Sequence, residues 1–549
     1  MEKLNADTRA IGAILKEEFF YRVPEYQRPF SWDDDNFEDL IDDILSANKE
    51  QEYFLGTIVL HRQEKEGIYD VIDGQQRLTS IMILLACLRD LAAKPNFKND
   101  IQKKILQEED VVDAIPAKER LEVKDRHIFK EVVVTDGGTV AARGKKSLPE
   151  PEWRYINAVN IFLSRLSGLS QDDIEQVIRF ISQKCVVIFL ATPNFAVAFR
   201  LFTIVNDRGK QLRRIDILKA TNLAPDIILK ESVRNKISHE WEGFEKGLGE
   251  AKFESIFHLV RLILLRDKPQ GDLLNEFEKR IFNNTKEGIT RGEPFFDLIF
   301  EYSALYRSIF DEREFVPEGD KDHIPYVALI HIMDSEFSAS EWRACLLYFA
   351  KRFGSEHFYA FCLKMERVYL AQWVKGTRKD ERYKDYSAIL GVIKSAKKAA
   401  DAIAGVSFDA NAITDATQRA DFYGAGFAKF MLLHLELVAA EHDALKEFSP
   451  KSVEHVLPQN PSAAGYWATR HDLSKIADYM NKIGNLVLLS KGKNSSANNL
   501  GFPEKKKKYL EKRVSDYPRS IQVLQHSDWL KKTIDDRTLE AKKLILQDP

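Results

Sequence analysis

A chain of 549 residues exceeds what one hydrophobic core usually supports, so we expect two or three domains. Hydrophobic residues make up 44% and charged residues 30% of the chain, which is typical of a globular protein in water. The 81 basic and 84 acidic residues nearly cancel, which excludes a uniformly basic protein. Any DNA-binding surface must therefore be local.

The sequence shows no sign of export or of a membrane span. It contains no run of about 18 apolar residues, and its first residues lack the basic and apolar segments of a signal peptide. The cysteines lie far apart and form no CxxC pair, which favours reduced core residues over a zinc site: Cys87, Cys185, Cys345 and Cys362. We therefore expect a cytoplasmic protein.

Three segments of different character follow one another, and together they predict an α+β multidomain protein. Residues 1–225 mix short β-rich runs with helical periodicity, which indicates an α+β domain. Within it, residues 131–152 are rich in glycine, proline and lysine and predict an exposed loop or hairpin. Residues 226–445 show amphipathic helical patterns and predict a helical middle domain. Residues 446–549 combine short strands with helices and form the predicted C-terminal domain.

A strand, a glycine turn and a helix start meet at the motif DGQQR. The apolar run YDVI leads into Asp73, and a helix is predicted to begin near Leu78. Backbone N–H groups at a helix N-terminus attract anions, so this arrangement predicts a phosphate site. Arg77 would add a charge-assisted fork, and Asp73 could hold a cation or position a water. The predicted site consists of Asp73, Gly74, Gln75, Gln76 and Arg77.

Two further clusters offer arginines that could join this site. Arg28 lies among aromatic residues in YQRPFSW, where a ring could stack on a base. Asn206 and Arg208 lie in the polar turn NDRG, before the predicted helix IDILKATNL. Each cluster alone is at least as typical of a structural turn. The segment GGTVAARGKKS lacks the GK[ST] ending of a P-loop, so the sequence does not support a Walker-type ATPase.

Near the C-terminus, Glu454 and His455 end a predicted strand and two asparagines follow at set intervals. Asn485 opens the strand NLVLLS, and Asn494 begins a polar stretch nine residues later, which is the layout of a ββα-metal fold. Phosphodiester hydrolysis requires an activated water and a cation. A neutral imidazole can accept the water's proton, and oxygen side chains suit Mg²⁺. We therefore expect His455 as the base, Asn485 as the residue that orients the imidazole, and Glu454 and Asn494 as metal ligands.

Lysines gather around and after this motif. A lysine run alone is more typical of a solvated helix face, but its place beside the predicted metal site favours contact with DNA phosphates. The predicted DNA-binding residues are Lys491, Lys493, Lys505 and Lys506.

The motifs of the chain resemble those of two families. VPEYQRPFSW, YFLGTIVL, VIDGQQRLTS and FTIVNDRGKQLRRIDILKA are similar to DUF262, over about residues 8–225. EHVLPQN, IGNLVLLSKGKNSSANN and FPEKKKKYL resemble DUF1524, a family of HNH-type (His-Me finger) nucleases. The first resemblance implies a ParB/sulfiredoxin-like fold in which the DGQQR residues bind and hydrolyse a nucleoside triphosphate. The second implies that His455 is the base and that Glu454 and Asn494 hold the metal.

A fusion of these two families resembles the GmrSD-like type IV, modification-dependent restriction enzymes and the phosphorothioate-sensing nickases similar to them. This resemblance implies an anti-phage endonuclease that cleaves or nicks modified foreign DNA with Mg²⁺ or Mn²⁺, controlled by GTP, ATP or another nucleoside triphosphate, and compatible with a homo-oligomer. Two alternatives stay open. One is a ParB-like, nucleotide-dependent DNA-binding regulator with a vestigial nuclease domain. The other is a nuclease in which DGQQR serves only structure.

Overall fold

The computed structural model describes residues 5–549 with short gaps, and its architecture is α+β, as expected. Outside the description lie residues 1–4, 17, 25–26, 28, 64–66, 113–114, 146–148, 150–151, 206–212, 284–288, 443–451, 490–493, 495–496, 498 and 511–516, and the side chains of residues 196, 200, 203–205 and 510. The chain divides into two compact units, Met1–Trp241 and Glu242–Pro549. Each unit contains a hydrophobic core of its own.

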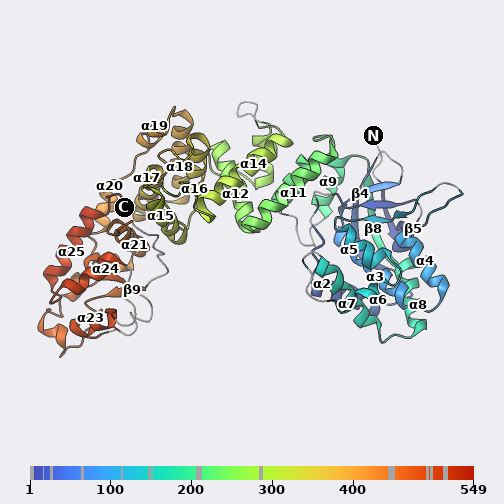
Figure 1. Ribbon diagram of the computed structural model, residues 1–549, viewed down its shortest axis with the longest axis horizontal. Coiled ribbons are helices and arrows are strands. Elements are labelled where there is room, and N and C mark those ends of the chain that lie inside the picture. The colour runs from blue at the N-terminus through green and yellow to red at the C-terminus, as the bar shows by residue number, and fades with distance from the viewer. Residues whose placement is uncertain are drawn as a thin grey trace. The chain divides into compact units, whose positions relative to one another are not determined.

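A six-stranded mixed sheet forms the centre of the first unit (Figure 1). Its strand order is β1-β8-β3-β4-β2-β7; the β1–β8 and β3–β4 pairs are antiparallel and the other three are parallel. A separate small hairpin consists of β5 and β6. The strands are β1 (Asn5–Ala10), β2 (Phe20–Arg22), β3 (Tyr53–Arg62), β4 (Ile68–Asp73), β5 (Leu106–Gln107), β6 (Lys118–Glu119), β7 (Leu121–Glu122) and β8 (Cys185–Thr192).

Helices enclose this sheet because its central strands are apolar on both faces. Helix α3 is buried at every position from Leu78 to Arg89, and α4, α6, α7 and α8 pack around it. Helix α9 packs against β3, β4 and β8. The helices of this unit are α1 (Ile11–Ile14), α2 (Asp34–Ser46), α3 (Gln75–Leu91), α4 (Pro95–Ile105), α5 (Arg126–Phe129), the π-helix η1 (Lys130–Val134), α6 (Gly138–Ala142), α7 (Glu152–Leu166), α8 (Gln171–Gln183), α9 (Phe195–Val205), α10 (Arg214–Asn222) and the start of α11 (Glu231–Leu248).

The prediction of an exposed loop or hairpin over residues 131–152 is wrong for its first part. Val132–Val134 are buried in η1, and the carbonyl of Val133 accepts a hydrogen bond of 2.8 Å from the buried Arg89 guanidinium. At Gly138 a β-carbon would lie 2.3 Å from the carbonyl oxygen of Glu131, so the chain turns tightly into α6. The apolar triplet outweighs the glycine-rich composition because it docks against α3.

The second unit begins as an array of helices, which confirms the predicted helical character of residues 226–445. Its elements are α12 (Glu250–Leu265), α13 (Leu273–Glu276), η2 (Phe277–Ile281), α14 (Glu293–Tyr306), η3 (Arg307–Asp311), α15 (His323–Glu336), α16 (Glu341–Phe353), α17 (Phe358–Lys375), α18 (Lys379–Ser395), α19 (Ala399–Ala404), α20 (Ala410–Ala416), η4 (Phe422–Gly424) and α21 (Ala428–Val438).

The C-terminal part of this unit contains one two-stranded sheet and short helical turns around a tryptophan-rich core. Helix α21 packs against β10, α24 and α25, so this part shares its packing with the preceding helices. Its elements are β9 (Ser452–His455), η5 (Tyr466–Thr469), η6 (Ile476–Asp478), η7 (Ile483–Asn485), β10 (Leu486–Leu489), α23 (Phe502–Leu510), α24 (Pro518–Ile521), η8 (Gln522–Gln525) and α25 (Lys531–Leu544).

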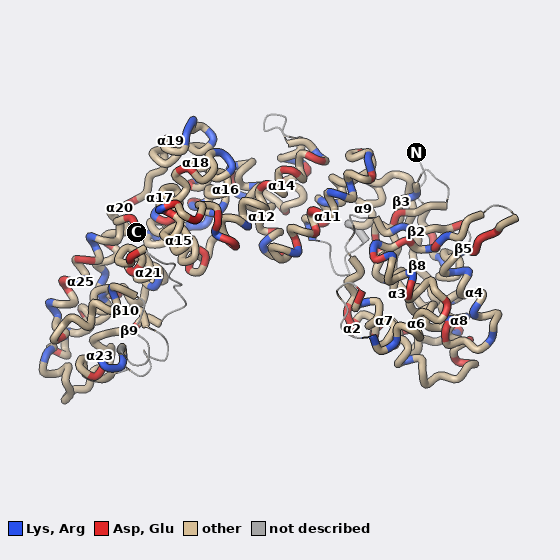
Figure 2. Tube along the Cα trace, viewed as in Figure 1, with Lys and Arg blue, Asp and Glu red and all other residues tan. Residues whose placement is uncertain are grey.

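Charges and cysteines are distributed as the composition suggests. Acidic and basic residues are interspersed over the elements of both units (Figure 2). All four cysteines are buried free thiols, which confirms their assignment to the core.

In the described part of the chain, no helix combines the length and hydrophobicity that crossing a membrane would require.

Candidate active site

Strands β9 and β10 pair antiparallel and form a two-stranded sheet, and His455 is the last residue of β9. His455 lies opposite Leu486, and Glu454 lies opposite Val487. Both strands were expected from the apolar runs, and both are confirmed. Because successive side chains of a strand point to opposite faces, Glu454 and His455 project to different sides of β9.

The imidazole of His455 is held by residues outside the predicted motif. Its Nε2 lies 2.9 Å from Oδ1 of Asn481, and the ring of Tyr423 meets it edge-on with centroids 4.3 Å apart. The same Oδ1 accepts a hydrogen bond of 3.1 Å from the side-chain amide of Gln459. An amide oxygen can only accept hydrogen bonds, so Nε2 of His455 must carry the hydrogen. In the neutral imidazole the lone pair is then on Nδ1.

The surroundings of His455 favour its neutral form. The residue is only 8% exposed. Burial lowers the pKa of His455 to about 4; the Asn481 hydrogen bond opposes this shift and the Lys505 charge adds to it. The imidazole is therefore uncharged at pH 7 and able to accept a proton.

Asn485 does not contact the imidazole, contrary to the prediction. It is fully buried, and its Oδ1 accepts hydrogen bonds from the Leu457 backbone N–H at 2.8 Å and the Trp529 indole at 2.9 Å. Its amide donates to the carbonyls of Leu457 and Met480 at 2.9 and 2.7 Å. All of its hydrogen-bonding capacity ties together the segments around β10, so Asn481 takes the orienting position instead.

Glu454 forms a buried ion pair on the other side of β9. Its Oε1 accepts from the Lys505 ammonium at 2.7 Å and from the Tyr509 hydroxyl at 3.1 Å. Lys505 also donates to the carbonyl of His455 at 2.7 Å. Residues 505 and 509 lie one turn apart on α23, so one helix face supplies both donors. Burial raises the pKa of Glu454, although Lys505 and Tyr509 oppose this, and burial lowers the pKa of Lys505.

The predicted DNA-binding lysines have different positions. Lys505 is completely buried, so its assignment to a DNA surface is corrected to a core ion pair. Lys506 is half-buried and donates to the carbonyl of His526 at 2.9 Å. The next residue, Lys507, is exposed on the same helix. Lys491 and Lys493 lie outside the described residues.

Asn494 lies against strand β9 near its start. Its Nδ2 donates to the Ser452 hydroxyl and, at 3.1 Å, to the carbonyl of Val453. Val453 precedes His455 by two residues, a separation of about 7 Å along a strand. Within the described residues, no group of three or more His, Cys, Asp or Glu side chains could hold a metal ion.

In the first unit, the DGQQR motif forms the expected strand, turn and helix. Asp73 ends β4, Gly74 adopts φ 91° in the left-handed region, and Gln75 begins α3. Gln76 fastens a neighbouring loop: its Oε1 accepts from the backbone N–H groups of Ser31 and Trp32 at 2.8 and 3.2 Å. Its amide also donates to the carbonyl of Pro29 at 3.0 Å. The loop is therefore fixed beside the start of α3.

The guanidinium of Arg77 packs against Gly56, where a side chain would leave it no room. Its guanidinium donates to the carbonyl of Thr57 at 3.2 Å, and a β-carbon at Gly56 would approach within 2.8 Å of it. Burial lowers the pKa of Arg77 and raises the pKa of Asp73, and the attraction between the two charges opposes both shifts. Gly56 thus belongs to the site for a steric reason.

Of the other residues predicted for this site, some line a hollow and the rest lie outside the described part of the chain. Gln75 and Gln76 line a small hollow together with Thr79 and Tyr155. Arg28, Asn206 and Arg208 lie outside the described residues.

Comparison with protein families gives three matches along the chain. Residues 11–223 match the model "GmrSD restriction endonuclease, N-terminal domain", and residues 408–542 match "GmrSD restriction endonucleases, C-terminal domain". Residues 243–383 match DUF7834, a family of unknown function. No curated protein matches the chain. The C-terminal match begins two residues before α20 and includes η4, which carries Tyr423.

Proposed function

We propose that the C-terminal part of this chain cleaves DNA with His455 as the general base. The chain carries both domains of the GmrSD restriction endonucleases and is a GmrSD-like type IV restriction enzyme. The observation that supports this proposal most strongly is a neutral, nearly buried imidazole fixed through Nε2 by Asn481. We assign this part to the ββα-metal (HNH) class and the first unit to the ParB-like class.

In the proposed reaction, Nδ1 of His455 takes a proton from the water that attacks the phosphorus atom. Asn481 keeps the hydrogen on Nε2, and the edge-on ring of Tyr423 restricts rotation of the imidazole. Strand β9 pairs with β10, and the carbonyls of Val453 and His455 on its other edge accept hydrogen bonds from Asn494 and Lys505. The proposed phosphate would therefore lie beside Nδ1 of His455.

The proposed metal ligands offer a carboxylate and an amide oxygen, the kind of donor that a hard divalent cation such as Mg²⁺ or Mn²⁺ prefers. Within the described residues, Glu454 contacts Lys505 and Tyr509 through Oε1 alone, and Asn494 donates only through Nδ2. Glu454 Oε2 and Asn494 Oδ1 therefore stay available, and Mg²⁺ commonly completes so small a protein ligand set with water. When bound, the cation would stabilise negative charge at the scissile phosphate.

We propose that the first unit binds and hydrolyses a nucleoside triphosphate at Asp73–Arg77 and senses DNA modification. The N-terminus of α3 behind Gly74 offers backbone N–H groups to a phosphate. Arg77 and Asp73 supply a cation and a carboxylate there, whereas Gln76 positions the adjoining loop. Arg28, Asn206 and Arg208 enter this proposal through the family resemblance alone.

One observation favours the alternative of a DNA-binding regulator with a vestigial nuclease. The Lys505 ammonium already neutralises Glu454, which is the arrangement expected where no cation binds. The two functions differ in a simple way. A regulator binds DNA but leaves the phosphodiester backbone intact at every Mg²⁺ concentration.

The deciding experiment incubates the purified chain with modified and unmodified phage DNA, with and without Mg²⁺ and each nucleoside triphosphate. We expect cleavage that requires Mg²⁺ and that His455→Ala abolishes while nucleotide hydrolysis continues. The control is His526→Ala, which removes a half-buried histidine of the same unit. Cleavage by His455→Ala at the wild-type rate would refute the assignment, and intact DNA in all mixtures would favour the regulator.

A further inference from the structure

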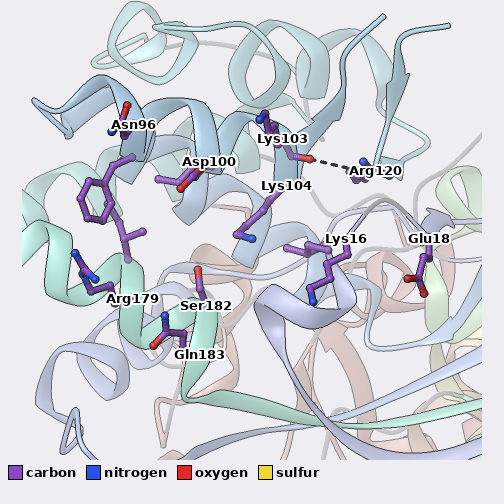
Figure 3. A pocket seen from close by; sticks show the side chains of 14 residues that line it. Lys16, Glu18, Asn96, Asp100, Lys103, Lys104, Arg120, Arg179, Ser182 and Gln183 are labelled. Atoms are coloured by element: carbon purple, nitrogen blue, oxygen red, sulfur yellow. Dashed lines mark hydrogen bonds between the residues drawn. The ribbon is translucent and has the colours of Figure 1, made fainter. Parts of the chain in front are cut away.

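A pocket of about 690 Å³ lies in the first unit between α4, α8 and the segment after α1 (Figure 3). The side chains of Lys16 and Lys104 point into the same space, from the loop after α1 and from α4. None of the lining residues belongs to Asp73–Arg77. They are Leu15, Lys16, Glu18, Asn96, Phe97, Asp100, Ile101, Lys103, Lys104, Arg120, Ile178, Arg179, Ser182 and Gln183, and we call this site the lysine pocket.

The lysine pocket has an excess of positive charge. Its lining contains five basic residues and two acidic ones, Glu18 and Asp100. Within the described part of the chain, no carboxylate lies in ion-pair contact with four of the basic residues: Lys16, Lys103, Lys104 and Arg179. Burial lowers the pKa of Lys104, and the nearby charge of Lys16 lowers it further, against the attraction of Asp100. These cations repel one another unless an anion lies between them.

Other cations of the first unit do form ion pairs with carboxylates. Beside the pocket, Lys94 before α4 pairs with Glu175 of α8 at 2.8 Å. Arg22 on β2 pairs with Asp70 at 2.8 Å. Elsewhere in the first unit, cations therefore have carboxylate partners, whereas Glu18 and Asp100 of the lysine pocket form no ion pair with those four cations within the described residues.

The remaining lining residues suit a phosphate group and an attached flat ring. Asn96, Ser182 and Gln183 offer side-chain hydrogen bonds, and the Arg179 guanidinium lies 5.2 Å from the centroid of the Phe97 ring. Lysines bind phosphate as point charges from several directions, which matches cations placed on three separate segments. The volume lies within the range of ligand pockets of about 300–1,000 Å³.

We propose that the lysine pocket binds phosphate groups, supplied either by the DNA backbone or by a free nucleotide. The site is separate from both sites of the proposed function. It would give the first unit a contact with nucleic acid, or with a nucleotide, that does not involve the DGQQR motif.

The test measures phosphate binding by the full chain with two probes, inorganic pyrophosphate and a short fluorescein-labelled DNA duplex. The double variant Lys16→Gln/Lys104→Gln removes the two converging cations. The control is Lys98→Gln, on the same helix α4 but outside the pocket. We expect the double variant to weaken binding about tenfold or more, and the control to leave it unchanged.

The two probes distinguish the source of the phosphate. If DNA is the ligand, the duplex loses affinity and the slope of log K against log salt falls by about 0.9 for each lost phosphate contact. If a free nucleotide is the ligand, pyrophosphate binding falls and duplex binding does not. Arg179→Gln, an exposed position, repeats the test should the double variant fail to fold. Equal affinity of wild type and pocket variants for both probes, or equal losses in Lys98→Gln, would overturn the proposal.

Discussion

Each candidate site contains a carboxylate and a cation, but only in the C-terminal site do the two form an ion pair within the described residues. In the C-terminal part, Glu454 and Lys505 form a buried ion pair at 2.7 Å. In the first unit, Arg77 donates to the carbonyl of Thr57, and within the described residues it makes no ion pair with Asp73. A closed pair mainly holds structure, whereas separated charges can still accept a ligand. The Glu454–Lys505 pair therefore does more to hold the fold, and it leaves only Oε2 of Glu454 for the metal of the proposed function.

The largest effect should come from breaking the closed pair. Lys505→Met leaves Glu454 buried without its cation, which should cost about 3–5 kcal/mol of unfolding free energy. Glu454→Gln/Lys505→Met should recover most of this loss, since no charge stays buried and the Tyr509 hydroxyl keeps an acceptor. Urea denaturation of the single and double variants measures the coupling. Equal destabilisation by both would show that the pair does not hold the fold.

The two asparagines just before β10 should separate stability from activity. Asn485→Ala removes four buried hydrogen bonds and should lower the unfolding free energy by about 2–3 kcal/mol. Asn481→Ala should leave the melting temperature almost unchanged but reduce kcat about tenfold or more, since the imidazole loses its anchor. Thermal melts and steady-state cleavage kinetics measure the two effects. The reverse pattern would return the orienting role to Asn485.

A smaller effect is expected where Arg77 packs against Gly56. Gly56→Ala adds a β-carbon 2.8 Å from the guanidinium at φ 111°, which should destabilise the chain by about 1–3 kcal/mol and weaken nucleotide binding. The control is Gly144→Ala, at φ 75° with no atom within 4 Å, which imposes backbone strain without the clash. Titration with a labelled nucleotide compares the two variants. Equal affinities would remove Arg77 from the proposed nucleotide site.

Local patterns predicted much of this molecule. The strand-glycine-helix turn at DGQQR, the strands around His455 and the helical middle segment follow from periodicity and turn chemistry within a few residues. Asn481 could have been suspected, because residues just before β10 must lie near residues just after β9 in an antiparallel pair. Tyr423 gave no such signal, since it reaches His455 only through the packing of η4 on the C-terminal part.

Buried polar residues were the hardest to assign from sequence. Lys505 has the composition of a surface residue within a lysine run, yet the helical period turns it inward onto Glu454 while Lys507 faces solvent. Asn485 has the chemistry of a catalytic amide, but the indole of Trp529 and two backbone segments use its hydrogen bonds. Both outcomes depend on tertiary contacts that spacing along the chain does not encode.

The pH dependence of kcat/KM for DNA cleavage tests the central claim most directly. With the pKa of His455 lowered to about 4, the base stays neutral under mild acid, so kcat/KM should remain level from pH 7 to about pH 5 and fall below that. His455→Ala should lose cleavage, and added imidazole should restore part of it with an acid limb shifted to the higher, ordinary pKa of free imidazole. A wild-type limb at the ordinary histidine pKa, or the same profile in His455→Ala, would contradict the account.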